Sequence, residues 1–200
     1  IIRNTILYNI VFIFLGTAFS VFIAILLNEC SRKWQKRYQT LILIPHLLSY
    51  VVVSYIAYAF LGAENGMINN QILRPLGLDP ISFYTEDKYW PFILVFVNIW
   101  KTFGYSSIIY FASIIGIDRT YYEAAEVDGA SAWTQIWSIT LPLLKPVLIT
   151  MLLLSVGRIL YSDFGLFYQV PMDSGMLFNT TNTIDTFVYR GLLQTNDLGR

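Results

Sequence analysis

Residues 123–142 read EAAEVDGASAWTQIWSITLP, a polar and helix-favouring stretch between two long apolar runs. Asp118, a little upstream, can cap a helix over 119–127, since its carboxylate can accept from the first unpaired backbone N–H groups. Gly129 follows an aspartate and marks a turn, because glycine tolerates a positive φ. We predict a second helix over 130–139 that ends before the closing Leu-Pro pair. The stretch is therefore predicted to form a helix–turn–helix with one apolar side and one acidic edge.

The composition surrounding this stretch is that of a membrane protein. Hydrophobic residues make up 56% of the chain and charged residues 13%, whereas soluble domains carry about 25% charged residues. The mean hydropathy is +0.55. The net charge is zero, which gives no reason to expect a nucleic-acid partner. One cysteine and one histidine exclude a disulfide framework and argue against a zinc site, so we expect no metal and no cofactor.

Four apolar runs are each near the ~20 residues that a membrane-spanning helix needs. The first and third runs are unbroken, and the second is interrupted by a proline. The fourth run reaches further along the chain if the helix tilts or breaks. We therefore predict an all-α, polytopic transmembrane bundle with one membrane domain over 1–200. The predicted spans are 6–27, 41–61, 90–115 and 143–161, the last reaching 168 in its longer form.

The loop charges predict the orientation of these spans. The short loop 28–40 carries four cations, which places it in the cytoplasm by the positive-inside rule. The chain then alternates, so that 62–89 is external, 116–142 is cytoplasmic and the segment after 168 is external. We expect 62–89 to form turns and short helices rather than a domain.

Two interpretations of the cytoplasmic segment remain open on composition alone. It could lie at the lipid headgroups, anchored by Trp133 and Trp137. Alternatively, it could be the surface on which a second protein pushes on the membrane part.

The spacing within the segment resembles the EAA motif of ATP-binding-cassette importer permeases. The pattern is Glu-Ala-Ala, three residues, Gly, nine residues, Ile, one residue, Leu-Pro. This resemblance implies that the segment 116–142 couples the permease to an ATPase. The implied coupling residues are Glu123, Ala124, Ala125, Asp128, Gly129, Ile139, Leu141 and Pro142.

The resemblance extends over nearly the whole chain. Residues 98–101 and 104–105 resemble carbohydrate-type permeases, and 155–158 and 184–190 resemble the LplB-type subgroup, associated with oligosaccharides and polysaccharide-derived sugars. It implies a MetI-like fold of six spans. Four of these are present, so we expect a permease domain truncated at both ends.

The resemblance also implies the working partners. An importer of this kind has cytoplasmic ATPase subunits that bind ATP, so the permease itself is expected not to be an enzyme. It also has a second permease, forming a heterodimer, and an external solute-binding lipoprotein, all at a bacterial plasma membrane and its lipid. The expected function is ATP-driven sugar import. The alternatives are a permease for another solute and a secondary transporter.

Polar residues within the apolar runs predict a substrate path. They recur at i, i+3 and i+7 as Asn98, Lys101 and Tyr105, and again as Ser155, Arg158 and Ser162. An ionisable group near the middle of a span usually faces a bundle interior or an aqueous path. The predicted path residues are Asn98, Lys101, Tyr105, Arg158 and Asp163. The alternative is a snorkelling cation, or an ion pair of Lys101 or Arg158 with Asp163.

The single histidine, His46, is set aside at this stage. It follows Pro45 at the inner end of the second predicted span. No partner residue is visible in the sequence, so we predict that His46 is not a ligand.

Overall fold

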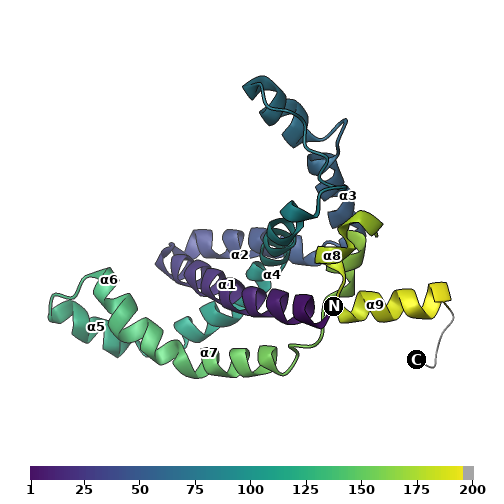
Figure 1. The fold of residues 1–200 in the computed structure, drawn as a ribbon. Coiled ribbons are helices and arrows are strands. Elements are labelled where there is room, and N and C mark those ends of the chain that lie inside the picture. The colour runs from purple at the N-terminus through teal and green to yellow at the C-terminus, as the bar shows by residue number, and fades with distance from the viewer. Residues whose placement is uncertain (196–200) are drawn as a thin grey trace. The chain divides into compact units, whose positions relative to one another are not determined.

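The computed structural model describes residues 1–195, and these residues form helices and turns without a strand (Figure 1). They fall into two compact units. The first unit holds Ile1–Phe12, Leu48–Asn98 and the residues from Ile159; the second holds Ile13–Leu47 and Ile99–Arg158. The α-helices are α1 (Ile2–Glu29), α2 (Arg32–Leu47), α3 (Tyr50–Leu61), α4 (Trp90–Ile115), α5 (Arg119–Val127), α6 (Ala132–Gln135), α7 (Leu141–Val156), α8 (Phe178–Thr181) and α9 (Ile184–Arg190).

Three helices in the described residues are long and apolar enough to cross a membrane: α1, α4 with its preceding turn, and Ala132–Val156. The third predicted span, 90–115, has the limits of α4. The predicted span 41–61 is interrupted as expected, but the break lies at Leu48 and Ser49 rather than at Pro45. The two halves, α2 and α3, make a fourth span only if the bent pair is counted as one.

The interruption follows from a helix cap rather than from the proline. Pro45 lies inside α2, and the helix runs on past it to Leu47. Ser49 then caps α3, with its side chain accepting from the backbone N–H of Val52 at 3.3 Å. A serine in this position favours the start of a new helix.

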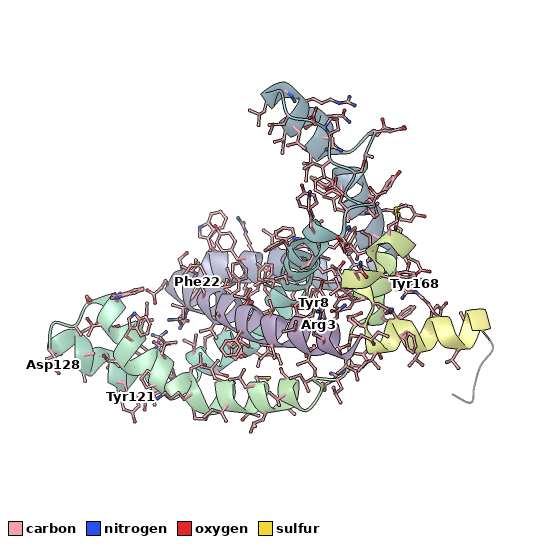
Figure 2. The ribbon with its side chains drawn as sticks, viewed as in Figure 1. Arg3, Tyr8, Phe22, Tyr121, Asp128 and Tyr168 are labelled. Carbon is pink, nitrogen blue, oxygen red and sulfur yellow. The ribbon has the colours of Figure 1, made fainter. Side chains whose placement is uncertain are left out.

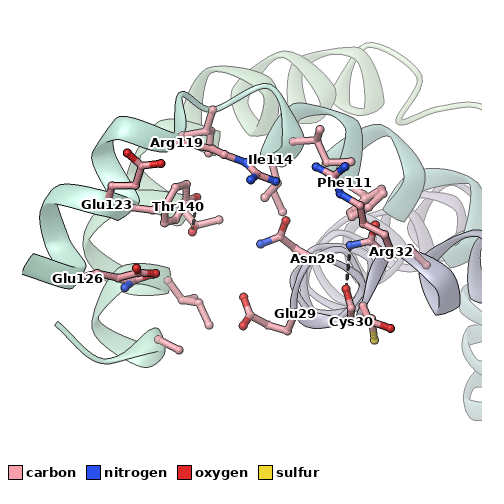
Figure 3. Close-up of a pocket in the computed structure, with 18 of the residues that line it drawn as sticks. Asn28, Glu29, Cys30, Arg32, Phe111, Ile114, Arg119, Glu123, Glu126 and Thr140 are labelled. Atoms are coloured by element: carbon pink, nitrogen blue, oxygen red, sulfur yellow. Dashed lines mark hydrogen bonds between the residues drawn. The ribbon is translucent and has the colours of Figure 1, made fainter. Parts of the chain in front are cut away.

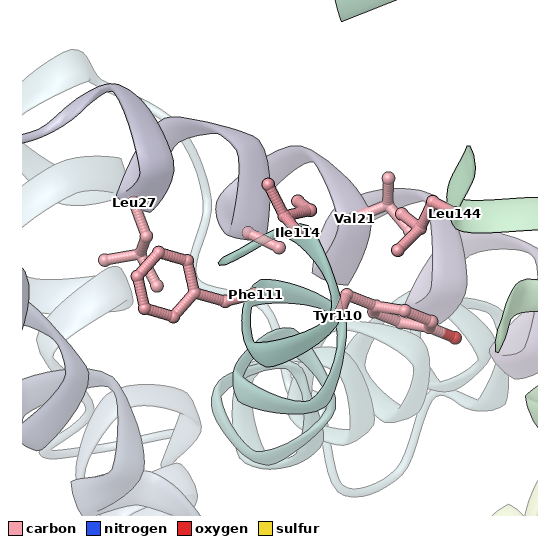
Figure 4. Close-up of a cluster of buried hydrophobic side chains, with 7 residues drawn as sticks. Val21, Leu27, Tyr110, Phe111, Ile114 and Leu144 are labelled. Carbon is pink, nitrogen blue, oxygen red and sulfur yellow. The ribbon is translucent and has the colours of Figure 1, made fainter. Parts of the chain in front are cut away.

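The apolar core of the second unit joins α1, α4 and α7. Its ring-bearing members, Tyr110 and Phe111, lie one turn before Ile114 on α4 (Figure 4). Because lipid is as apolar as these side chains, it is their close van der Waals packing, rather than removal from water, that stabilises the contact. The buried members are Val21, Ala24, Leu27, Tyr110, Phe111, Ile114 and Leu144.

The crossing of α2 and α4 depends on a glycine. Gly104 on α4 is buried, and a Cβ added to it would lie 1.8 Å from the carbonyl oxygen of Ile42 on α2. The two backbones therefore touch at this point. Small residues permit this kind of close helix packing in membranes.

In the first unit, the segment 62–89 is held together by buried polar contacts. Asn69 is fully buried and donates to the carbonyl oxygens of Ala63 and Ile81 at 3.1 and 2.9 Å. The indole of Trp90 donates to Phe83 at 2.7 Å. The segment consists of turns and short π and 3₁₀ helices, Ile68–Leu73, Arg74–Leu76 and Asp87–Tyr89, which confirms the prediction for it.

In the part of the chain after Ile159, an ion pair joins the buried Arg190 to the half-buried Asp173. Arg190 at the end of α9 lies 2.7 Å from Asp173, and its guanidinium stacks 3.9 Å over the ring of Phe178. Asp173 and the preceding Met172 both have positive φ, at 49° and 54°. The ion pair thus holds a backbone conformation that non-glycine residues rarely adopt.

We expect Arg190→Ala to destabilise the protein by about 3 kcal/mol, because removing one partner leaves the Asp173 charge partly buried and unpaired. Thermal unfolding of the purified protein in detergent measures this. The matched control is Lys88→Ala, since Lys88 also lies 2.7 Å from its partner, Glu86, but both side chains are exposed. Such an exposed pair contributes little to stability, because solvent screens it. Equal effects of the two variants would contradict the assignment.

Candidate coupling site and substrate path

The hairpin formed by α5 and α6 begins as the sequence predicts. α5 spans Arg119–Val127, and Asp118 caps it by accepting from the backbone N–H of Thr120 at 3.0 Å. This bond to the carboxylate form lowers the pKa of Asp118 below its ordinary value. The cap therefore stays charged near neutral pH.

The turn of the hairpin is a Schellman motif. Gly129 has a φ of 76°. Its N–H donates to Glu126 at 3.0 Å, and the N–H of Ala130 donates to Ala125 at 2.8 Å. These two bonds satisfy carbonyl groups that the end of α5 would otherwise leave unpaired. The predicted role of Gly129 in a tight turn is confirmed.

The predicted end of the second helix before Leu141 is wrong. After α6, the chain widens into a π-helix, Ile136–Thr140, and continues directly into α7. The N–H of Leu141 bonds to Ile136 rather than to the residue four before it. Pro142 then sits in the first turn of α7, where its missing N–H and fixed φ are tolerated.

One hydrogen bond ties the two arms of the hairpin together. The hydroxyl groups of Tyr122 on α5 and Thr140 at the start of α7 lie 2.9 Å apart. Thr140 is buried. α5 is therefore attached to Ala132–Val156, the continuous helix that includes α6, by a side-chain hydrogen bond as well as by the chain itself.

The outer face of the hairpin carries uncovered apolar side chains. Val127 is 88% exposed and Trp133 68% exposed, and the rings of Trp133 and Trp137 meet edge to face at 5.9 Å. Asp128 lies at the tip (Figure 2). This face fits either a protein partner or a lipid headgroup region, so the geometry leaves both interpretations open.

The inner face of the hairpin borders a hollow of about 950 Å³ in the second unit (Figure 3). Its other walls are the end of α1, the first turns of α2 and the end of α4. In the part of the chain that the structure describes, no ion pair joins the charged side chains of this lining. They are Glu29, Arg32, Lys36, Arg119, Glu123 and Glu126.

Lys101 is buried and holds the end of α2. Its ammonium group donates to the carbonyl oxygens of His46 at 3.0 Å and Pro45 at 3.5 Å. A cation at these positions satisfies the last carbonyl groups of the helix and interacts favourably with its dipole. Lys101 thus has structural contacts at the end of α2, whereas the structural alternative expected from the sequence was snorkelling or an ion pair with Asp163.

Tyr105, one turn further on, lies against the histidine that the sequence analysis set aside. The rings of His46 and Tyr105 stack with centroids 4.9 Å apart and planes 13° from parallel. Both side chains are exposed. The sequence gives no sign of this pair, because it joins residues far apart in the chain.

The prediction of a second polar stripe, formed by Ser155, Arg158 and Ser162 on one helix, is wrong. α7 ends at Val156, and Arg158 lies in the turn that follows. Asn9 donates to the carbonyl oxygens of Ile159 and Tyr161 at 2.9 and 3.0 Å, and so satisfies this non-helical backbone. Ser162 is buried, bonded through its N–H to Asp185 at 2.7 Å and through its hydroxyl to Thr183 at 2.8 Å. The stripe therefore does not lie on one helix face.

Asp163 also has a local structural role. Its carboxylate accepts from the backbone N–H groups of Gly165 and Leu166 at 3.0 and 3.4 Å, at the start of the helix Gly165–Gln169. Asp163 and Asn98 belong to the first unit, whereas Lys101, Tyr105 and Arg158 belong to the second. Their assembly into one substrate path remains a prediction.

The helices and the capped hairpin define a membrane subunit that crosses the bilayer several times. Residues 2–162 match the family described as the binding-protein-dependent transport system inner membrane component, and the chain belongs to that family. This confirms the resemblance to importer permeases and the MetI-like fold class.

Two relatives from Bacillus subtilis show how far the similarity extends, and one of them is named as a polysaccharide transport permease. The chain is 36% identical to the polygalacturonan/rhamnogalacturonan transport system permease protein YteP of Bacillus subtilis, over 84% of this chain and 52% of that protein. It is 31% identical to the protein LplB of the same organism, over 94% of this chain and 59% of that protein. The chain thus spans little more than half the length of these relatives.

A solved structure shares the fold. It is the crystal structure of a bacterial alginate ABC transporter in complex with an alginate pentasaccharide-bound periplasmic protein. The TM-score is 0.89 at 33% identity, over 98% of this chain and 67% of that one.

Proposed function

We propose that the chain is the permease part of an ATP-driven importer of oligosaccharides or polysaccharide-derived sugars. The observation that carries the proposal is the capped hairpin 119–142. It combines the EAA spacing, a rigid Schellman turn at Gly129 and an uncovered apolar face. Membership of the transport family and the carbohydrate names of the relatives support the substrate class.

The partners follow from this role. The four cations of the predicted loop 28–40 lie in the first turns of α2, and they favour a cytoplasmic position for that end of the second unit, and hence for the hairpin. A cytoplasmic ATPase then binds the hairpin and hydrolyses ATP, so this chain is not itself the enzyme. A second permease completes the path, and an external solute-binding lipoprotein delivers the sugar.

The coupling is mechanical. A push on α5 passes through the Tyr122–Thr140 hydrogen bond into the helix Ala132–Val156. Leu144 on that helix packs in the core with α1 and α4. Because packed interiors resist compression, the movement is transmitted to both membrane helices.

The test is retention of the ATPase. We expect Glu123→Ala in the full-length protein to reduce co-purification of its ATPase subunit about tenfold, since the variant removes an anionic contact at the docking site. Quantitative pull-down from detergent-solubilised membranes measures this. Glu64→Ala, in the segment proposed to be external, is the control and should retain the ATPase. Full retention by the Glu123 variant would contradict the role of this carboxylate.

A further inference from the structure

The hollow beside the hairpin lies at the depth of the lipid headgroups. Two of the helices whose ends line it are long, since α1 has 28 residues and α4 has 26. At about 1.5 Å per residue each helix is roughly 40 Å long, whereas the hydrocarbon core is only ~30 Å thick. The last residues of both helices therefore project from the core into the polar layer of the bilayer.

The charged residues of the hollow are balanced in number but separated in space. Three cations and three carboxylates line it, and no ion pair joins them within residues 1–195. Figure 3 shows Glu123 and Glu126 of α5 on one side of the hollow and Arg32 of α2 on the other. Lys36, one turn after Arg32, lines the same wall as Arg32. A molecule that carries both a negative and a positive charge can therefore bond to both walls at once.

The size and the apolar part of the lining favour a lipid as this molecule. The hollow measures about 950 Å³, within the roughly 300–1,000 Å³ of small-molecule sites. Phe111, Ile114 and Ile115 at the end of α4 add apolar surface to the charged walls. A soluble zwitterion leaves such surface uncovered, whereas the glycerol and acyl part of a phospholipid covers it.

We propose that the hollow binds the phosphoethanolamine headgroup of a membrane phospholipid. Arg32 and Lys36 bind the phosphate, since guanidinium and ammonium groups make charge-assisted hydrogen bonds to phosphate oxygens. Glu126 and Glu29 accept from the ammonium group, which has three N–H donors. The bound lipid then joins α2 to the hairpin. This assignment does not depend on which solute the protein transports.

The opposite face of the same turns provides a matched comparison. Lys33 and Arg37 also lie in the first turns of α2, but they are absent from the lining of the hollow. Arg37 lies 5.0 Å over the ring of Trp34, which stacks on Tyr38 at 5.9 Å. Cations beside exposed aromatic rings are typical of a general contact with the membrane surface. This face has no carboxylate wall opposite it that would select an ammonium group.

The first experiment measures which phospholipid the protein retains. The full-length protein, assembled with its partner permease and ATPase in detergent, is delipidated and then given equal amounts of dioleoyl phosphatidylethanolamine, phosphatidylcholine and phosphatidylglycerol. Native mass spectrometry counts the bound lipids. We expect about fivefold more phosphatidylethanolamine than either of the others, because choline has no N–H donor and glycerol has no cation. Equal retention of the three lipids, or retention of none, overturns the proposal.

The second experiment separates the hollow from general surface charge. Arg32→Gln with Lys36→Gln should reduce the retention of phosphatidylethanolamine about tenfold, because two phosphate contacts are lost. Lys33→Gln with Arg37→Gln removes the same charge from the same two turns and should retain the lipid as wild type does. If both double variants lose the lipid equally, the hollow is not the site and the proposal is overturned.

The third experiment tests the position of the ammonium group. Glu126→Gln should lower the retention of phosphatidylethanolamine about threefold and leave that of phosphatidylglycerol equal or higher, since one carboxylate partner is lost. A misfolded variant would lose both lipids, and a fall in both contradicts the assignment of Glu126. Soluble O-phosphoethanolamine in large excess should not displace the lipid. Displacement would show that the hollow takes the free compound, and would overturn the lipid assignment.

Discussion

Gly104→Ala is expected to cost about 3 kcal/mol or more of stability, at the upper end of the range for overpacked sites. A Cβ at this position would lie 1.8 Å from the carbonyl oxygen of Ile42, which is backbone and cannot rotate away. α2 and α4 would have to separate, and the bonds from Lys101 to the end of α2 would be lost with them. Thermal unfolding of the full-length protein in detergent measures the effect.

The control for this variant is Gly16→Ala. Gly16 lies inside α1, and nothing in the structure lies within 4 Å of an added Cβ. Alanine favours a helix over glycine by about 1 kcal/mol, so this variant should be as stable as wild type or slightly more stable. If Gly104→Ala unfolds at the wild-type temperature, the close backbone contact between α2 and α4 is contradicted.

Gly129→Val is expected to reduce ATP-driven uptake at least tenfold while the protein still inserts into the membrane. The space around an added side chain is open, so the effect arises from the backbone. A φ of 76° is a conformation in which valine costs more than the 1–2 kcal/mol typical of non-glycine residues. The turn then loses the geometry that we propose docks the ATPase. Uptake and substrate-stimulated ATP hydrolysis in proteoliposomes measure the loss.

Two controls distinguish coupling from general strain. Gly129→Asn should transport nearly normally, because asparagine tolerates the left-handed conformation. Gly77→Val introduces the same strain at a φ of 73° in the segment 62–89, also with open space around it, and should leave coupling intact. Substrate-stimulated ATP hydrolysis at the wild-type rate in Gly129→Val would refute the prediction.

The parts of the fold that could be predicted from the sequence depend on local chemistry. The limits of α4 follow from an uninterrupted apolar run with a tryptophan at its start, and those of α5 follow from the Asp118 cap and the Asp-Gly turn. A cap, a glycine with positive φ and a span length are each decided by residues close together in the chain. The EAA spacing is local in the same sense, and it led directly to the family.

The parts that could not be predicted depend on distant contacts. The early end of α7 accompanies bonds from Asn9, about 150 residues away. The backbone carbonyl of His46 accepts a hydrogen bond from Lys101, 55 residues later. The π-helix before Leu141 absorbs one extra residue, which a periodicity argument cannot anticipate. A sequence pattern does not show contacts between residues that are far apart in the chain. The prediction of a polar stripe through Arg158 was wrong for this reason.

The hollow beside the hairpin has a practical consequence. Cys30, the one cysteine in these 200 residues, lies on its lining, opposite α5 and α6. A nitroxide or fluorophore attached there would need no engineered site. With a second label on the tip of the hairpin, the distance between the two labels could be measured with and without ATP. Changes in this distance would report the movement of the hairpin during transport.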